Sequence, residues 1–429
     1  VRPLWRRTLT GAEVVGPARR LAPQPSPAVT TFKRGSQPRQ RMTITVPGPT
    51  LGVVGGGQLG RMLAEAAAPL GVETIVLDPT PDCPAAPVAR DQIVGDFDDA
   101  DAIGRLADRT DALTYEIELA DPDHLTDAGE AADVPVHPTP GTLRTIQDKF
   151  LEKEMLTDAG IPVPEYRRVD SVADLEAAVE AFGAVMLKAR RGGYDGRGNV
   201  PVRSPDEAED AIETVGTVDD PAALAEAFVD FEREVSVIGV QGDGEVRTFP
   251  VGENVHEEEI LRETVVPART SGAVKERART VAREVLDALD GRGVFGIELF
   301  ETSGGDVLVN EIAPRPHNSG HWSIEGAVTS QFEQHARAVL GWPLGSTRRR
   351  APTVSANVLG TVDETRPAEL GGVEAVLEAE SAHLHWYGKD SVRPLRKMGH
   401  VTATDEDGGT DPTALLESTR ELRDALTFR

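Results

Sequence analysis

The chain has 429 residues, 39% of them apolar, a length that suits two to four domains. No apolar run reaches the roughly 18 to 20 residues that cross a bilayer, so no membrane partner is expected. The single cysteine, Cys83, excludes an intramolecular disulfide framework and a cysteine-rich metal site.

Charge is spread unevenly along the chain. The formal net charge is −26, but residues 1–41 hold nine basic residues and one acid, which leaves 36 basic against 70 acidic residues and a net of −34. This excess of acid disfavours a nucleic-acid partner, because phosphate binding needs a basic face. With only seven lysines, the composition suggests a halophilic surface whose self-repulsion is screened by salt. An acidic mesophilic protein is the alternative.

Residues 1–41 show no sustained apolar period and no apolar core of a signal peptide. We expect this segment to be a mis-called extension, with Met42 as the true start, or else a disordered tail.

The next hundred residues alternate between short apolar runs and helical patterns. This alternation predicts a parallel sheet covered by helices. The expected elements are strands at 51–54, 74–77, 92–94 and 112–115, and helices at 58–70 and 98–108.

A glycine pattern lies between the first strand and the first helix. Gly55, Gly57 and Gly60 are followed 18 residues later by Asp78, as in dinucleotide-binding turns. Glycines let backbone amides approach an anion at a helix start. The pattern fits a dinucleotide and another phosphate ligand about equally, and a purely structural turn is the third reading.

The middle of the chain predicts an α+β block, entered after Pro138 and Pro140. The expected helices are 142–159, 205–215, 221–227, 271–290 and 328–340, and the expected strands are 184–189, 234–240, 246–251, 294–300 and 306–312. Residues 351–429 predict short strands and turns with a last helix at 412–426.

A glycine-rich loop follows the strand at 184–189. Lys188 and the four glycines among residues 192–198 can fold over a triphosphate, with lysine as point charge and glycine amides around phosphate oxygens. An exposed hairpin is the alternative. No Gly-Lys-Ser/Thr ends the loop, so it is not a Walker motif.

Two glutamates lie inside apolar strands. Glu298 and Glu311 would each be costly to bury unpaired, and a divalent cation between them would relieve their repulsion. Pairing with arginine is the alternative. Glu234 in a third strand is a candidate acceptor for a nucleotide ribose, or an ordinary strand-edge acid.

Two polar clusters follow. Arg315, His317 and Asn318, directly after the Glu311 strand, can hold and polarise a small anion such as bicarbonate. Residues 383–400 form a basic island in an acidic chain and suit a phosphate clamp, unless they simply pair with the acidic surface.

Together these motifs resemble the ATP-grasp family and, within it, the 5-(carboxyamino)imidazole ribonucleotide synthetases. The resemblance runs from about Leu51 to His400. It is carried by Gly57-Gln58-Leu59-Gly60-Arg61-Met62, Tyr115-Glu116-Ile117-Glu118, the loop at 193–198, the run from Asn310 to His321, and His385-Trp386-Tyr387-Gly388-Lys389 with Arg396-Lys397-Met398-Gly399-His400.

The resemblance implies an α/β and α+β chain with an ATP-grasp fold, an N-terminal Rossmann-like pre-ATP-grasp domain and a small C-terminal β-rich domain. The implied boundaries after residues 1–41 are 42–141, 142–345 with a lid at about 163–228, and 346–429. It further implies a cytoplasmic homodimer.

The resemblance also implies a reaction and the residues that serve it. ATP would phosphorylate bicarbonate to carboxyphosphate, which carboxylates the amine of 5-aminoimidazole ribonucleotide in purine biosynthesis, with Mg²⁺ as cofactor. The implied metal ligands are Glu298 and Glu311. The implied catalytic residues are Tyr194, Arg315, His317, Asn318 and Lys389. The implied ribonucleotide ligands are Gln58, Leu59, Asp78, Glu116, Lys389 and Arg396. The implied ATP ligands are Arg144, Lys188, Gly193, Tyr194, Asp195, Gly196, Arg197, Gly198, Asn199, Glu226, Ala227, Phe228, Val229, Glu234, His256, Asn310 and Glu311.

Three other functions remain open from the sequence. A formate-dependent glycinamide ribonucleotide transformylase shares the acyl-phosphate chemistry. An NAD(P)-dependent dehydrogenase explains the first glycine turn but leaves Glu298 and Glu311 without a role. A non-catalytic ATP-grasp homologue would not need both carboxylates and Lys188.

Overall fold

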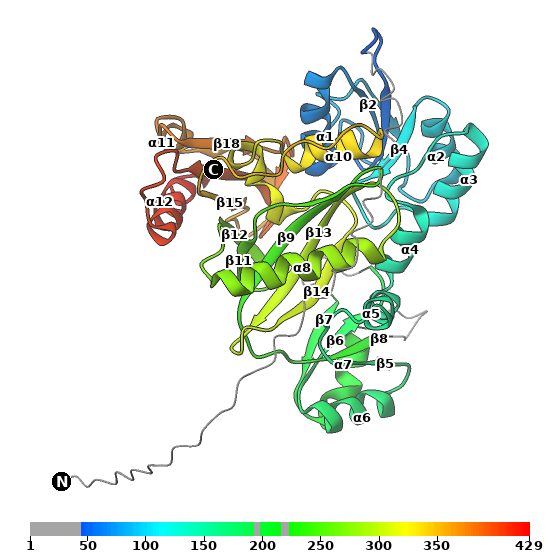
Figure 1. Cartoon of the computed structure of the whole chain (residues 1–429), viewed down its shortest axis with the longest axis vertical. Coiled ribbons are helices and arrows are strands. Elements are labelled where there is room, and N and C mark those ends of the chain that lie inside the picture. Colours follow the sequence, from blue (N-terminus) through cyan, green and yellow to red (C-terminus); the bar gives the residue numbers. More distant parts are fainter. Residues whose placement is uncertain (1–43, 193–197, 216–222) are drawn as a thin grey trace, which may run out of the picture. The chain divides into compact units, whose positions relative to one another are not determined.

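The computed structural model of the chain describes residues 44–192, 198–215 and 223–429 (Figure 1). Residues Ile44–Arg429 form one compact unit. Among the described residues, no helix is both long enough and apolar enough to cross a membrane.

The N-terminal sheet confirms the alternating prediction. Its four strands are parallel and lie in the order β3-β2-β1-β4. The elements are β1 (Thr50–Val54), α1 (Gln58–Ala67), β2 (Glu73–Asp78), β3 (Asp91–Val94), α2 (Ala100–Ala107) and β4 (Ala112–Tyr115). A further helix, α3 (Pro122–Ala132), was not predicted. All five residues of β1 are buried, as expected of a strand covered on both faces.

The helix predicted at 142–159 is wrong as a single element. It is two helices, α4 (Pro140–Gln147) and α5 (Lys149–Asp158), which meet at Asp148. Asp148 has extended backbone, and its carboxylate accepts from the N–H groups of Phe150 and Leu151. This side-chain cap starts a new helix and so ends the first one.

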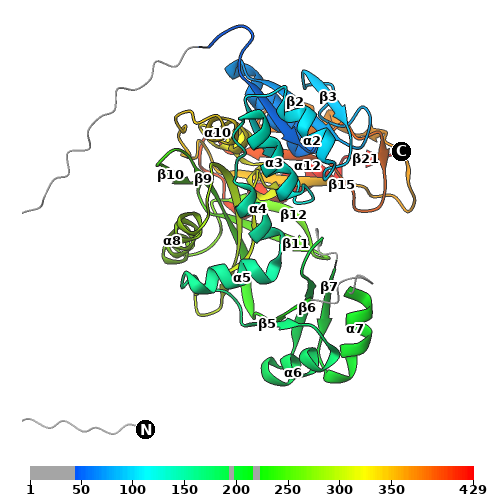
Figure 2. The ribbon, with the colours of Figure 1, turned by 90° about the vertical axis from the view of Figure 1, so that its right-hand side faces the viewer.

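A second sheet contains the strand that carries Lys188. Its order is β5-β8-β6-β7, and α6 (Val172–Phe182) and α7 (Ala208–Val215) pack on it (Figure 2). The strands are β5 (Tyr166–Val169), β6 (Val185–Ala189), β7 (Asn199–Val202) and β8 (Ala223–Ala227). The helix predicted at 221–227 is wrong, because residues 223–227 form β8. Pairing with β5 and β6 on both sides overrides the helical propensity of this alanine-rich segment.

The largest sheet has nine strands and continues into the C-terminal region. Its path is β14-β13-β9-β11-β12-β15-β20-β18, with β10 beside β9. The strands are β9 (Phe231–Gln241), β10 (Val246–Thr248), β11 (Gly252–Glu257), β12 (Ile260–Val266), β13 (Gly293–Thr302), β14 (Val307–Ala313), β15 (Thr353–Leu359), β18 (Ala382–Trp386) and β20 (Lys397–Thr404). Helix α8 (Gly272–Ala288) lies across β9, β13 and β14 (Figure 1). Strands on either side of the expected boundary at 345 therefore share one sheet.

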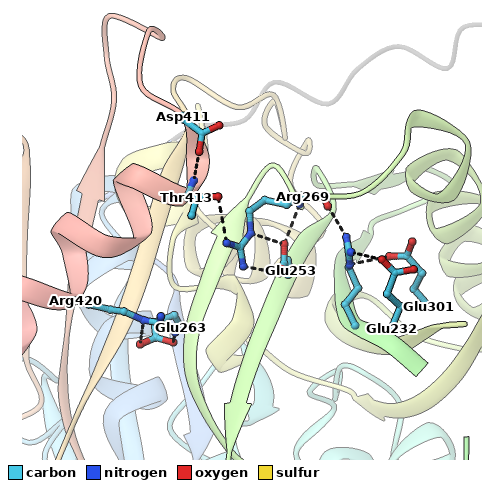
Figure 3. A network of polar contacts seen from close by, with 9 residues as sticks. Glu232, Glu253, Glu263, Arg269, Glu301, Asp411, Thr413 and Arg420 are labelled. Carbon is cyan, nitrogen blue, oxygen red and sulfur yellow. Dashed lines mark hydrogen bonds and ion pairs between the residues drawn. The ribbon is translucent and has the colours of Figure 1, made fainter. Parts of the chain in front are cut away.

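Helix α12 (Pro412–Asp424) is tied to this sheet by buried ion pairs (Figure 3). Glu263 on β12 is 1% exposed and accepts from Arg420 at 2.9 and 3.0 Å, and it also pairs with Arg423. Beside it, Arg269 binds Glu253 of β11 through both carboxylate oxygens. A further helix, α10 (Gln331–Val339), packs against α1 and β13.

Candidate active site

One large cleft gathers the residues that the sequence singles out. It has a volume of about 1980 Å³ and is lined by residues of the N-terminal sheet, of the sheet that carries Lys188 and of the nine-stranded sheet. The predicted site residues that line it are Gln58, Leu59, Asp78, Glu116, Arg144, Lys188, Asn199, Glu226, Ala227, Phe228, Val229, Glu234, His256, Glu298, Asn310, Glu311, Arg315, His317, Asn318, Lys389 and Arg396.

The remaining predicted residues fall into two groups. Gly193, Tyr194, Asp195, Gly196 and Arg197 lie outside the described residues. Gly198 is described but does not line the cleft, and its carbonyl accepts from the Ala189 N–H at 2.9 Å.

The two predicted metal carboxylates lie opposite each other. Glu298 on β13 pairs in register with Glu311 on β14, next to a bulge. Burial, reinforced by the like charge of Glu311 and opposed by His256, raises the pKa of Glu298 from 4.5 to about 7. Asn254 Nδ2 donates to Glu298 Oε1 at 3.1 Å. Ionisation of Glu298 beside Glu311 is therefore unfavourable in the absence of a cation.

The pKa of Glu311 is shifted in the opposite direction. Lys149 lies 3.3 Å from its Oε1 and, with Lys188 and His317, lowers the pKa of Glu311 to about 2, although about half of the Glu311 side chain is exposed. Lys149 is the first residue of α5, so the Asp148 cap that starts the helix also places this ammonium. Lys149 could not be predicted from the sequence, because an isolated lysine in a polar helix gives no signal.

A buried network holds Lys188. Glu226 on β8 is 3% exposed and pairs with Lys188 and, at 2.7 Å, with Lys153. Burial would raise the pKa of Glu226, but the two lysines outweigh it and hold the pKa at about 2. Lys153 Nζ also donates to the carbonyls of Val309 and Asn310 at 3.1 and 2.9 Å. Lys153, also not predicted, thus ties β8 to the strand that carries Glu311.

His256 and Glu234 form a pair on adjacent strands of the same cleft. Their Nδ1 and Oε2 atoms lie 3.1 Å apart. Burial would lower the pKa of His256, but the contact with Glu234 raises it. The charged pair offers a carboxylate acceptor for a ribose hydroxyl.

Arg315 and His317 come directly after β14. Arg315 grips Glu118 through Nε at 2.8 Å and Nη2 at 3.0 Å. His317 has its Nδ1 2.9 Å from Ser319 Oγ and 3.9 Å from Glu298 Oε1. A Cβ on Gly296 would lie 2.4 Å from His317 Cβ, so only glycine lets the imidazole approach β13 this closely.

The first glycine turn is partly closed by acidic side chains. Gly56 N–H donates to Asp78 Oδ2 at 2.9 Å, and Gly57 N–H donates to Glu116 Oε1 at 2.6 Å. Thr80 N–H donates to the other Asp78 oxygen at 2.9 Å, so Asp78 holds the turn itself. Burial raises the pKa of Glu116 to about 7, although Gly57 and Arg315 oppose the shift.

Lys389 and Arg396 line the same cleft from the segment between β18 and β20. Lys389 Nζ donates to the Lys397 carbonyl at 2.7 Å. Burial and the neighbouring Arg396 lower the pKa of Lys389 to about 7, against the attraction of Glu116. Arg396 donates to Ser391, and the intervening Leu395 has a left-handed φ of 60°. Arg144, by contrast, is half exposed and pairs with Asp123 of α3.

The residues fit a magnesium ion only together with another ligand. Among the described residues, no three His, Cys, Asp or Glu side chains converge as a metal cage. Two carboxylates on neighbouring strands, one of them with a raised pKa, suit Mg²⁺ completed by substrate phosphates and water.

Fold and site together define an ATP-grasp enzyme. Residues 154–332 match the model of the ATP-grasp domain, residues 49–147 that of the ribonucleotide synthetase preATP-grasp domain, and residues 353–410 that of the phosphoribosylaminoimidazole carboxylase C-terminal domain.

Individual relatives identify one kind of enzyme within this class. An N5-carboxyaminoimidazole ribonucleotide synthase of Brucella melitensis is 46% identical over 84% of this chain and 97% of its own length. One of Pseudomonas aeruginosa is 42% identical over 86% and 98%. The crystal structure of the Aspergillus clavatus enzyme in complex with ADP and 5-aminoimidazole ribonucleotide matches with a TM-score of 0.80 and 34% identity over 89% of this chain and 100% of that one.

The chain belongs to the N5-carboxyaminoimidazole ribonucleotide synthase family. It is an ADP-forming ligase of purine biosynthesis. The expectations of the ATP-grasp fold and of this function are confirmed.

Proposed function

We propose that the chain passes the γ-phosphoryl group of ATP to bicarbonate and then the carboxyl group to the amine of 5-aminoimidazole ribonucleotide. The proposal rests on one observation, which is that two groups of charged residues line the large cleft. In the first group, Lys188 lies near Glu311, which pairs in register with Glu298; in the second group, Lys389 lies near Arg396 and near Glu116 of the first glycine turn. The relative solved with ADP and 5-aminoimidazole ribonucleotide supports two ligand sites of this kind.

At the nucleotide end, Lys188 and Lys149 would neutralise the phosphates, and Glu234 would accept from the ribose. Glu298 and Glu311 would hold Mg²⁺, which neutralises charge on the transferred phosphoryl group when bound. The side chains do no covalent chemistry and act by positioning and charge. We propose these contacts for the predicted ATP ligands, namely Arg144, Lys188, Gly193 to Asn199, Glu226 to Val229, Glu234, His256, Asn310 and Glu311.

Between the two ends, Arg315, His317, Asn318 and Tyr194 would hold the carboxyl donor. A bicarbonate oxygen attacks the γ-phosphorus, and ADP leaves. The amine nitrogen then attacks the carboxyl carbon of carboxyphosphate, phosphate leaves, and the nitrogen loses a proton. Arg315, held by Glu118, places its positive charge where the carboxyl oxygens carry negative charge.

At the acceptor end, Lys389 and Arg396 would bind the ribose phosphate at the start of α1. Gln58, Leu59 and Glu116 would contact the same ligand, and Asp78 would act through the turn that it holds. Only the protonated form of Lys389 can pair with that phosphate, and its pKa near 7 leaves a protonated fraction at neutral pH.

The test is an omission experiment with the purified protein. Phosphate release and incorporation of labelled bicarbonate are measured with ATP, Mg²⁺, bicarbonate and 5-aminoimidazole ribonucleotide, leaving out each in turn. We expect carboxylated product only in the complete mixture. Product without bicarbonate, or turnover with formate and glycinamide ribonucleotide instead, would refute the proposal.

Four further properties are proposed with it. The domain boundaries would fall at 41, 141 and 345, with a lid at about 163–228, and the enzyme would work in the cytoplasm as a homodimer, which light scattering can test. The net charge of −34 beyond residue 41 supports a halophilic enzyme. Activity that falls steadily from low salt to molar KCl would contradict the last point.

A further inference from the structure

Two glutamines on α10 hold distant backbone segments in the same manner. Gln331 and Gln334 are both fully buried. Gln331 Oε1 accepts from the His317 N–H at 2.9 Å, and its Nε2 donates to the His317 carbonyl at 2.7 Å. Gln334 makes the same two bonds with Gly345, at 2.8 and 2.7 Å. Each amide therefore satisfies both polar backbone groups of one residue, as a neighbouring strand would.

The fit around Gln331 leaves little freedom. A Cβ on Gly320 would lie 2.3 Å from Gln331 Oε1, so the turn after His317 closes directly onto the amide. Gln331 Nε2 also lies 3.3 Å from His321 Nδ1. Burial keeps the His321 imidazole neutral by lowering its pKa well below 6.5, so this nitrogen can accept a hydrogen bond.

These contacts hold the backbone of His317, whose side chain lines the cleft. With its backbone fixed by Gln331, His317 packs its Cβ against Gly296 and places Nδ1 3.9 Å from Glu298 Oε1. We propose that Gln331 is a positioning residue for His317, which rests on the proposed role of His317 beside the carboxyl donor. Gln334 makes an equivalent clamp away from the cleft and serves only the fold.

The matched pair gives a direct test. Gln331→Met and Gln334→Met each remove both hydrogen bonds to the clamped residue without much change in side-chain length, and Gln331→Met also removes the contact with His321. Each leaves one backbone N–H unpaired, while the His317 carbonyl still accepts from the Gly320 N–H and the Gly345 carbonyl from Arg247. Both variants should therefore lower the melting temperature by a similar amount. A shift of about 1 Å at His317 should lower kcat for carboxylated product by about 100-fold in Gln331→Met, with KM for ATP unchanged. Gln334→Met should keep the wild-type kcat.

Each outcome decides the matter. Equal loss of kcat in both variants, or wild-type kcat in Gln331→Met, would overturn the positioning role. If Gln331→Met does not fold, Gln331→Asn keeps the amide but shortens its reach by one methylene, and wild-type kcat in that variant would equally overturn it. If the wild-type protein itself forms no carboxylated product, the proposed function fails instead.

Discussion

Replacing Glu298 by glutamine is expected to stabilise the ligand-free protein while it abolishes turnover. Glu298 is 14% exposed, and its pKa is raised from 4.5 to about 7. Because the folded chain holds this proton more tightly than the unfolded chain, ionisation destabilises the fold. The penalty is absent below pH 4.5, grows between pH 4.5 and 7, and reaches about 3 kcal/mol above pH 7.

Glutamine removes the charge and keeps an oxygen that can accept from Asn254. Urea unfolding in EDTA should therefore show Glu298→Gln to be more stable than wild type by about 3 kcal/mol at pH 8, with a much smaller difference near pH 5. Glu311→Gln is the matched control. Lys149 favours the charged form of Glu311, so this variant should be no more stable than wild type.

Two results would refute the reasoning. The first is a Glu298→Gln variant that is no more stable than wild type at pH 8. The second is a gain of similar size in both variants, which would mean that the opposite pKa shifts of Glu298 and Glu311 do not affect the free energy of unfolding.

Three other predictions concern stability and the acceptor site. Glu263→Gln should lower the free energy of unfolding by about 3 kcal/mol in urea, because two arginines lose a buried counter-ion. Glu276→Gln, in an exposed pair, should leave it almost unchanged. Lys389→Met should raise KM for the ribonucleotide and not for ATP. In the wild-type protein, affinity for the ribonucleotide should weaken as pH rises through 7, because Lys389 loses its proton. An unchanged KM for the ribonucleotide in the variant would contradict this. Leu395→Gly should leave the melting temperature almost unchanged, since relief of a left-handed strain of roughly 1 kcal/mol is offset by the greater chain entropy of glycine; a large fall in melting temperature would contradict this.

Strongly patterned segments could be predicted from the sequence. The apolar run at 51–54 and the turn at Gly55 to Gly57 predicted a parallel strand and its helix, which are β1 and α1, because glycine fixes where the strand ends. Glu298 and Glu311 could be singled out because carboxylates in apolar strands are costly without a partner.

Features set by long-range pairing could not be predicted. Residues 223–227 have a helical composition and become a strand only between two partners. Lys149 reaches the cleft and Lys153 reaches Glu226 because Asp148 breaks one helix into two, which local propensity did not indicate. Gln331 is one more polar residue in an amphipathic helix, and its role depends on a loop that precedes it in the chain.

The sheet shared between β12 and β15 limits how this enzyme can be divided. A shortened chain that stops near residue 345 would leave β12 as an unpaired edge of seven residues, and such edges promote aggregation. It would also strip Glu263 of both arginines. For recombinant dissection or domain swapping between relatives, the ATP-grasp and C-terminal regions should therefore be exchanged together.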